Sequence, residues 1–353
     1  MKIYIVHHSA DFDGFFSGLI TAMGVIKNLK VSIDDITFVP YNYGDGLFIN
    51  KKEEITLLDK VEYNDFVFFV DCSWTKNREL YDGLIEKIGD PAQIVMVDHH
   101  DSAIDWVKEN AHDITYDASE NSSDPELNYP RSAAALCWDY FFTNIQIPKI
   151  VELVSEYDIW YKKNPTKWDE EILPFQYGMR NKGIDMWKIK DYFEEWSKIL
   201  EAGQSSGIIK LVEETIKDGK AIIQYQKSRS KTVAKSTGFE AFLETDDRCY
   251  LAYFAADYCA NSTLFEWGLS EEDQQKYDIF VLCRPVIGET RSYISIISNR
   301  EDISAAEICK KYGGGGHVKI AGCVVNIEKH YIREDDEYRV FFKEYEPPRE
   351  KTN

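Results

Sequence analysis

Acidic and histidine side chains are concentrated at three places in the first hundred residues, and these side chains are suited to binding metal ions. The three groups are His7-His8-Ser9-Ala10-Asp11-Phe12-Asp13, then Asp71, then Asp98-His99-His100. Carboxylates and imidazoles are common protein ligands of divalent cations. If the groups converge, their carboxylates repel one another unless a cation lies between them. We therefore expect a metal centre.

Each group directly follows a short apolar run, and this placement would bring the groups together. The runs are Ile3-Tyr4-Ile5-Val6, Phe66-Val67-Phe68-Phe69-Val70 and Ile94-Val95-Met96-Val97. Runs of this length and composition are typical of buried parallel strands. In an open parallel sheet, ligands bind outside the carboxyl ends of the strands. A single Asp after a strand is explained equally well as a helix N-cap or turn residue, but three such ends favour one shared site.

The order of these motifs resembles the DHH phosphoesterase superfamily. The matching elements are His7-x-x-x-Asp11-x-Asp13, Asp71, Asp98-His99-His100, and Asp158 within Ser155-Glu156-Tyr157-Asp158-Ile159-Trp160. Near the C-terminus, Gly313-Gly314-Gly315-Gly316-His317 followed by Ala321-Gly322 resembles the glycine-rich motif of the DHHA1 domain. The resemblance extends through nearly the whole chain. It implies a DHH/DHHA1 phosphoesterase, similar to the phosphodiesterases that include oligoribonucleases.

The resemblance also assigns roles to individual residues. It implies that His7, Asp11 and Asp71 hold one metal ion. It implies that Asp13, Asp71, His99 and Asp158 hold a second, with Asp71 bridging the two. Oxygen-rich ligands with a few imidazoles suit Mn²⁺, with Mg²⁺ or Co²⁺ as substitutes.

Three further residues lie beside the expected ligands. We expect His100 to contact the scissile phosphate, as a hydrogen-bond donor or as an acid to the leaving oxygen. Asp98 is expected to orient an imidazole, as outer partners of metal ligands often do. His8 lies outside the family pattern, and we expect a structural or supporting role for it.

The C-terminal half carries candidate substrate-binding residues. The backbone amides of Gly313, Gly314, Gly315 and Gly316, together with His317, are expected to bind phosphate oxygens; the alternative is a plain helix C-cap and turn. Arg284 and Arg291 are candidate phosphate ligands or ordinary surface charges. The aromatic residues beside the expected metal ligands either stack on a base or simply pack; these are Trp74, Tyr157 and Trp160.

Bulk properties limit the possible functions. The chain has 353 residues, 44% hydrophobic and 14% aromatic, which is enough for two globular domains. Its formal charge of −20 argues against a broad basic face for long duplex DNA. We expect no membrane span, because the apolar stretches are shorter than about 18 residues, and no signal peptide at the N-terminus. The seven scattered cysteines lack a CxxC pair, so we expect a reducing cytoplasm, no disulfides and no zinc ribbon.

The pattern of elements predicts an α/β fold with two lobes. Alternating strands and helices predict a doubly wound parallel sheet in a catalytic, metal-binding domain over residues 1–190. A helical connector is expected over 191–235, although this segment fits equally as part of the first domain. A second, smaller α/β domain of the DHHA1 type is expected over 236–345 for substrate binding, followed by a tail over 346–353.

These expectations combine into a metal-dependent phosphodiesterase that hydrolyses short oligonucleotides or related nucleotides by a two-metal mechanism. A cyclic dinucleotide or a nucleoside bisphosphate fits the same machinery. One alternative is an inorganic pyrophosphatase or polyphosphatase, which shares the metal motifs but lacks the glycine-rich motif. Another is a non-catalytic nucleic-acid-binding relative, although such relatives typically lose metal ligands. Strand polarity, RNA or DNA preference and oligomeric state stay open.

Overall fold

The computed structural model divides the chain into two compact units, Met1–Ala221 and Ile222–Asn353. It describes residues 1–42, 47–72, 78–100, 114–116, 131–244, 247–253, 263–286, 291–316, 318–326, 331–334 and 337–342. Within these ranges, none of the helices has the length and apolar character that crossing a bilayer requires. Each unit has its own core and is treated separately below.

The first unit is built on a five-stranded parallel sheet. Its strands, in spatial order, are β2 (Ile36–Tyr41), β1 (Ile3–His8), β5 (Phe66–Val70), β6 (Ile94–Asp98) and β7 (Ile114–Tyr116), and every neighbouring pair is parallel. The three apolar runs of the sequence are therefore the three adjacent strands β1, β5 and β6. This order is that of a doubly wound sheet, and it confirms the expected fold class.

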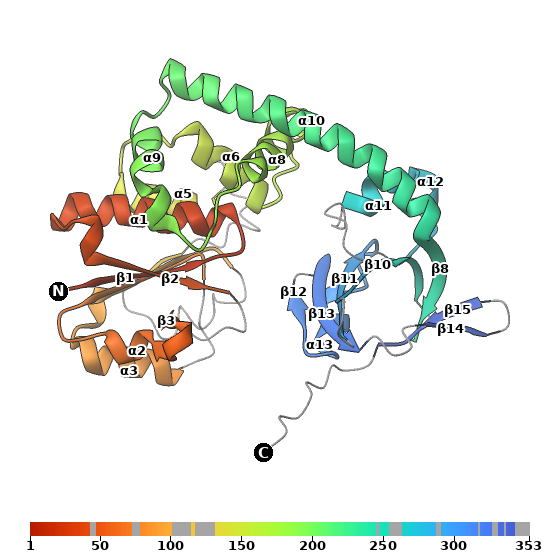
Figure 1. Ribbon diagram of the computed structural model, residues 1–353, viewed down its shortest axis with the longest axis horizontal. Coiled ribbons are helices and arrows are strands. Elements are labelled where there is room, and N and C mark those ends of the chain that lie inside the picture. Colours follow the sequence, from red (N-terminus) through yellow and green to blue (C-terminus); the bar gives the residue numbers. More distant parts are fainter. Residues whose placement is uncertain are drawn as a thin grey trace. The chain divides into compact units, whose positions relative to one another are not determined.

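Helices cover both faces of this sheet (Figure 1). The side chains of Ile3 and Ile5 join the core beneath α1 (Phe12–Leu29), whereas Tyr4 and Val6 join the opposite core with α3 (Arg78–Ile88). This division follows from the alternation of side chains along a strand. The other elements of the unit are β3 (Phe48–Asn50), β4 (Ile55–Thr56), α2 (Leu57–Lys60), α5 (Ala133–Phe141), α6 (Lys149–Asp158), α7 (Pro165–Lys167), the π-helical turn η5 (Trp168–Ile172), α8 (Leu173–Asn181) and α9 (Ile189–Glu201).

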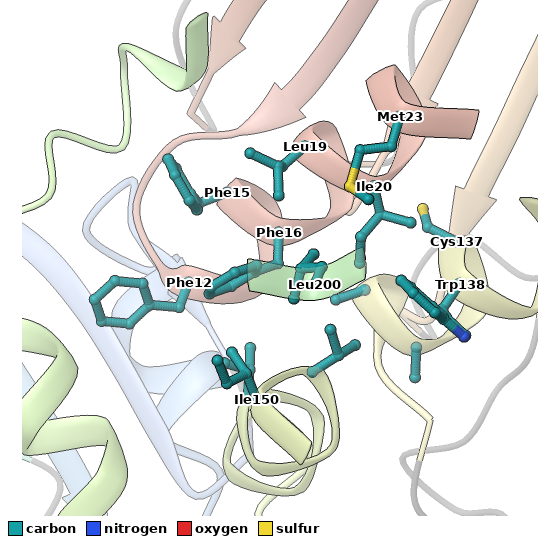
Figure 2. Close-up of a cluster of buried hydrophobic side chains, with 14 of the residues drawn as sticks. Phe12, Phe15, Phe16, Leu19, Ile20, Met23, Cys137, Trp138, Ile150 and Leu200 are labelled. Atoms are coloured by element: carbon teal, nitrogen blue, oxygen red, sulfur yellow. The ribbon is translucent and has the colours of Figure 1, made fainter. Parts of the chain in front are cut away.

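The larger core of this unit fixes the helix that carries the first motif. Figure 2 shows Phe15, Phe16, Leu19 and Ile20 of α1 among side chains of the helices packed around it, including Trp138 and Leu200. Phe15 and Phe16 are completely buried, and burying a side chain of this size contributes about 1.5–3 kcal/mol. Replacing Phe16 by Ala would cost about 3–5 kcal/mol. The first turn of α1 is therefore held rigidly over the end of β1.

The second unit contains an eight-stranded mixed sheet. Its order is β12 (Gly315–Gly316), β13 (Ile320–Asn326), β11 (Arg291–Ser298), β10 (Ile279–Pro285), β9 (Arg248–Tyr253), β8 (Gly238–Leu243), β15 (Glu337–Val340) and β14 (Tyr331–Glu334). One face packs on α13 (Ala305–Lys310). The other packs on α11 (Thr263–Gly268) and the last turns of α10 (Ser206–Thr237), and the short helix α12 (Glu271–Gln274) follows α11. This unit is a smaller α/β domain, as expected.

Candidate active site

The predicted metal ligands lie at the carboxyl ends of β1, β5 and β6. These three strands are neighbours, and the chain order of the sheet reverses between β1 and β5. Such a reversal leaves a crevice beyond the strand ends where α/β proteins bind their ligands. Asp71 directly follows β5, and Asp98 is the last residue of β6. The topology alone therefore brings the motifs to one edge of the sheet.

Asp71 is held at the centre of the site by an unusual backbone conformation. Its φ is +56°, in the left-handed region, and its amide donates to the carbonyl of Val97 at 3.0 Å. Asp is one of the few non-glycine residues that tolerate this region. The side chain is buried, and its two oxygens face different partners. Oδ2 lies 3.4 Å from Nδ1 of His8, and Oδ1 lies 3.4 Å from Nε2 of His99.

The first group of ligand atoms comes from His8, Asp11 and Asp71. Nδ1 of His8 lies 3.0 Å from Oδ2 of Asp11, and one atom from each of the three residues falls within 4.8 Å of the others. Asp11 is also the N-cap of α1, where its side chain accepts from the amide of Gly14 at 3.0 Å. The cap fixes the Asp11 side chain and directs it to the strand ends.

The second group of ligand atoms comes from Asp13, His99 and Asp158. Nε2 of His99 lies 3.1 Å from Oδ2 of Asp158 and 3.7 Å from Oδ2 of Asp13. Asp158 is the last residue of α6, so this helix contributes to the site in addition to α1 and the strand ends. Within the described residues Nε2 of His99 has no hydrogen-bond partner, although it is buried among carboxylates. Burial alone would lower the pKa of His99, but its contacts with Asp158 and Asp71 outweigh this and raise the pKa well above its usual value. An imidazole surrounded by carboxylates is a donor set that fits a divalent cation.

Asp13 is oriented by the N-terminus of α5. Its Oδ2 accepts from the amide of Ala133, and its Oδ1 accepts from the amide of Ala134, both at 3.0 Å. The hydroxyl of Ser132, the N-cap residue of α5, also donates to Oδ1. Amides at a helix N-terminus stabilise a negative charge. Asp13 therefore serves as the cap of α5 while it faces His99.

The site concentrates negative charge, and the pKa values reflect it. Burial, with the charges of Asp71 and Asp158, raises the pKa of Asp13 well above its usual value. Burial also raises the pKa of Asp158. Burial alone would lower the pKa of His8, but its contacts with Asp11 and Asp71 outweigh this and raise it to about 11. The arrangement therefore favours positive charge, which a bound divalent cation supplies best.

His100 and Asp98 belong to a third group of candidate ligand atoms, which they form with Asp71 and His99. Nδ1 of His100 lies 2.7 Å from Oδ1 of Asp98, which also accepts from the amide of His99 at 2.8 Å. Burial would lower the pKa of His100, but the Asp98 carboxylate outweighs it and raises the pKa to about 9. His100 therefore carries a proton at neutral pH. The pair has the geometry expected for a proton donor and the carboxylate that orients it; the catalytic role of His100 stays a prediction.

His7 and His8 occupy opposite faces of β1. His8 belongs to the first ligand group, whereas the ring of His7 is absent from all the ligand groups of the described residues. His7 lies beneath α1, where its side chain approaches Gly18 and meets the ring of Phe38 edge-on at 6.3 Å. Burial lowers its pKa to about 4, and Nε2 has no hydrogen-bond partner within the described residues. The charges of Asp71 and Asp11 nevertheless act on the His7 ring. The structure thus adds His8 to the candidate ligands at this strand end, and the role of His7 as a ligand stays a prediction.

Part of the expected substrate-binding set lines a pocket in the second unit. The pocket has a volume of about 570 Å³, and its lining includes Arg284, Tyr293, Tyr312, Gly313 and Gly314. Arg284 of β10 pairs directly with Tyr293 of β11. Arg284 and the first two glycines are therefore brought together. Tyr293 and Tyr312 were not singled out from the sequence, although Tyr312 directly precedes the glycines.

The other members of that set lie elsewhere. Gly315 and Gly316 form β12 and pair with β13, outside the pocket lining. A Cβ on Gly314 would lie 2.1 Å from the carbonyl oxygen of Gly322, so this glycine is required by the close approach of its own chain. Arg291 is outside the pocket lining, with its guanidinium 5.7 Å from the ring centre of Tyr293. His317 and Trp74 lie outside the described residues.

The chain shows distant similarity to known proteins. No family model matches the chain. An uncharacterized protein of Acanthamoeba polyphaga mimivirus is 23% identical over 322 residues, which is 90% of this chain and 66% of that protein, so the chain spans just under two thirds of its relative.

Three solved structures that are similar to the chain have 15–16% sequence identity to it. A pGpG-specific phosphodiesterase of Vibrio cholerae has a TM-score of 0.49, with 93% of this chain and 94% of that chain covered. A DHH domain from a member of the s1p family of ribosomal proteins has a TM-score of 0.45, covering 91% and 82%. An exopolyphosphatase-related protein of Bacteroides fragilis has a TM-score of 0.43, covering 91% and 86%.

Proposed function

We propose that this protein is a Mn²⁺-dependent phosphodiesterase that hydrolyses short oligonucleotides or related nucleotides. The observation that carries the proposal is the arrangement around Asp71. Its two carboxylate oxygens face two different groups of candidate ligand atoms, one with His8 and Asp11, the other with Asp13, His99 and Asp158. Two neighbouring divalent cations in such groups bind a phosphoryl group and lower the pKa of a bound water.

The residues of the site supply the rest of the chemistry. Water adds to phosphorus, the P–O bond to the leaving group breaks, and the products are a phosphomonoester and an alcohol. We expect the imidazole of His100 to give its proton to the leaving oxygen, while Asp98 holds the ring by Nδ1. Asp13 keeps its direction because the first amides of α5 bind both of its oxygens.

The second unit supports a nucleotide substrate rather than pyrophosphate. Its pocket of about 570 Å³ combines the cationic side chain of Arg284 with the rings of Tyr293 and Tyr312. Pyrophosphate has no apolar part that these rings could bind, whereas a nucleotide has both a phosphate and a base. The partner we propose is therefore a short oligonucleotide or nucleotide, not long duplex DNA or a membrane.

A substrate panel tests the proposal. The full chain is assayed with Mn²⁺ against a linear dinucleotide, a cyclic dinucleotide, a nucleoside 3′,5′-bisphosphate, pyrophosphate and polyphosphate, and Asp71→Asn serves as the inactive control. We expect hydrolysis of at least one nucleotide substrate and little of pyrophosphate. Preference for pyrophosphate or polyphosphate, or turnover undiminished in Asp71→Asn, would overturn the proposal.

A further inference from the structure

Trp160 lies two residues beyond the ligand Asp158 in an unusual backbone position. The end of α6 forms a turn in which the amide of Trp160 donates to the carbonyl of Tyr157 at 3.1 Å and the amide of Tyr161 donates to that of Glu156 at 2.9 Å. The φ of Trp160 is +57°. A helix that ends in this way usually has glycine at the left-handed position.

Three other helices of the same chain follow that rule, whereas α1 ends in a left-handed lysine, Lys30, with a φ of +56°. Gly183, Gly203 and Gly313 follow α8, α9 and α13, and their φ values are +64°, +59° and +72°. A bulky side chain at positive φ is a conformational outlier, and such outliers persist where the surrounding structure holds them, often at functional sites. The turn at the end of α6 therefore does not explain why position 160 carries a tryptophan, and a function of the side chain would explain it.

The Trp160 ring is held in place yet accessible. Its centre lies 5.0 Å from that of Trp168, at an interplanar angle of 61°, and Nζ of Lys162 lies 4.5 Å from the ring centre. Nearly half of the side chain, 48%, is nevertheless exposed to solvent. An aromatic ring fixed by neighbours and open to solvent is the kind of surface on which nucleic-acid bases stack.

The Trp160 ring belongs to a residue that is close in sequence to the proposed metal ligand Asp158. Two residues span at most about 7 Å of backbone, so the Trp160 backbone lies within that distance of Asp158. The Lys162 ammonium lies over the Trp160 ring and adds a positive charge there, in a chain whose net charge is −20. Base stacking and attraction of phosphate are thus available within one short segment, next to the place where the phosphate is expected.

We propose that Trp160 is a specificity-determining residue on which the base of the nucleotide at the metal centre stacks. The inference rests on the proposed function and deepens it, because it requires a substrate that carries an aromatic base. It predicts that polyphosphate and base-free sugar phosphates bind more weakly than nucleotides of the same charge. Trp160 would act on binding, not on the bond-breaking step.

The test compares variants at two equally exposed tryptophans. Trp187 is also 48% exposed but lies in another segment, and its amide bonds to Asp185 at 3.1 Å. Trp160→Ala, Trp160→Gly and Trp187→Ala are assayed with a ribonucleotide dimer and with the same dimer lacking its bases. The glycine variant suits the positive φ and separates loss of the ring from backbone strain.

We expect both Trp160 variants to raise KM for the base-bearing dimer about tenfold, with kcat within about twofold. KM for the base-free dimer should not change, and Trp187→Ala should behave as the wild type. Equal effects of Trp160 variants on both dimers, or none on either, overturn the inference.

A binding measurement keeps the inference testable if the wild type hydrolyses neither dimer. Adenosine 5′-monophosphate should then quench tryptophan fluorescence in the wild type, ribose 5-phosphate should not, and Trp160→Phe should show much less quenching. Equal quenching in the wild type and in Trp160→Phe overturns the inference.

Discussion

Replacing Asp71 by Asn should remove both cations while leaving the fold intact. Asn tolerates the left-handed conformation of position 71, where φ is +56°, so the change removes a charge without adding backbone strain. The Asp71 oxygens face both ligand groups, at 3.4 Å from His8 and 3.4 Å from His99. A variant in only one group, Asp11→Asn, should remove one cation, and Asn is as good an N-cap as Asp.

The size of the effect follows from ligand linkage. A cation present at about one hundred times its Kd stabilises the folded state by about 2.7 kcal/mol, so two cations contribute about 5 kcal/mol. In a unit of this length, Met1–Ala221, 1 kcal/mol shifts Tm by about 2–4 °C. Saturating Mn²⁺ should therefore raise the Tm of the wild type by roughly 10–20 °C. The rise should be about half in Asp11→Asn and absent in Asp71→Asn.

Calorimetry measures both the shift in Tm and the number of bound ions. Scanning calorimetry gives Tm with and without Mn²⁺, and titration calorimetry should give two, one and no bound ions in the three proteins. Asp65→Asn is the control, because Asp65 is a buried carboxylate outside both groups that accepts from the amides of Lys2 and Glu62. An unchanged Mn²⁺-dependent rise in Asp71→Asn would refute the bridging arrangement.

Three further outcomes test the site and the fold. His100→Ala should lower kcat by a factor of about 10²–10⁴ while Mn²⁺ stoichiometry in titration calorimetry stays at two; unchanged kcat contradicts its role as proton donor. His8→Asn should remove one ion in the same titration and His7→Asn should not, and the reverse result would show that His7 is the ligand. Gly219→Ala should lower the free energy of unfolding by about 1–3 kcal/mol or more, because the new Cβ would lie 1.7 Å from the carbonyl oxygen of Pro174. Gly207→Ala has open space around the new Cβ and should raise the free energy of unfolding by about 0.4–1 kcal/mol. Equal denaturation midpoints for the two variants would contradict this packing.

The central strands could be predicted because a strand buried on both faces needs a continuous apolar run. This holds for β1, β5 and β6, and it located Asp71 and Asp98 at the sheet edge. The edge strand β2 has no such run: it reads Ile-Thr-Phe-Val-Pro-Tyr, and Pro40 argues against a strand. Proline is tolerated there because an edge strand has a neighbour on one side only.

The choice between His7 and His8 could not be made from spacing. Both follow the same apolar run, and each could reach over the strand end. The alternation along β1 separates the two side chains, because His7 shares a face with Ile3 and Ile5 beneath α1. Which face lies under α1 is a property of the packed sheet, so the sequence pattern left it open.

The glycine run shows a different limit. Gly313 is left-handed and Gly314 has no room for a side chain against β13. The glycine amides were expected to bind phosphate oxygens, and that role stays a prediction. What the structure shows is a close approach of Gly314 to the chain's own strand. A sequence reveals that a position has no space for a side chain, and only the fold reveals what occupies that space.

The double role of Asp13 has a practical consequence for mutagenesis. Its carboxylate receives the first amides of α5 and the hydroxyl of Ser132, so its removal leaves those donors buried and unsatisfied. Leaving a buried donor unpaired costs about 1–3 kcal/mol. An inactive Asp13 variant would therefore mix a weakened scaffold with a missing ligand. Asp11, whose single capping bond Asn can replace, is the cleaner choice for an inactivated protein with native architecture.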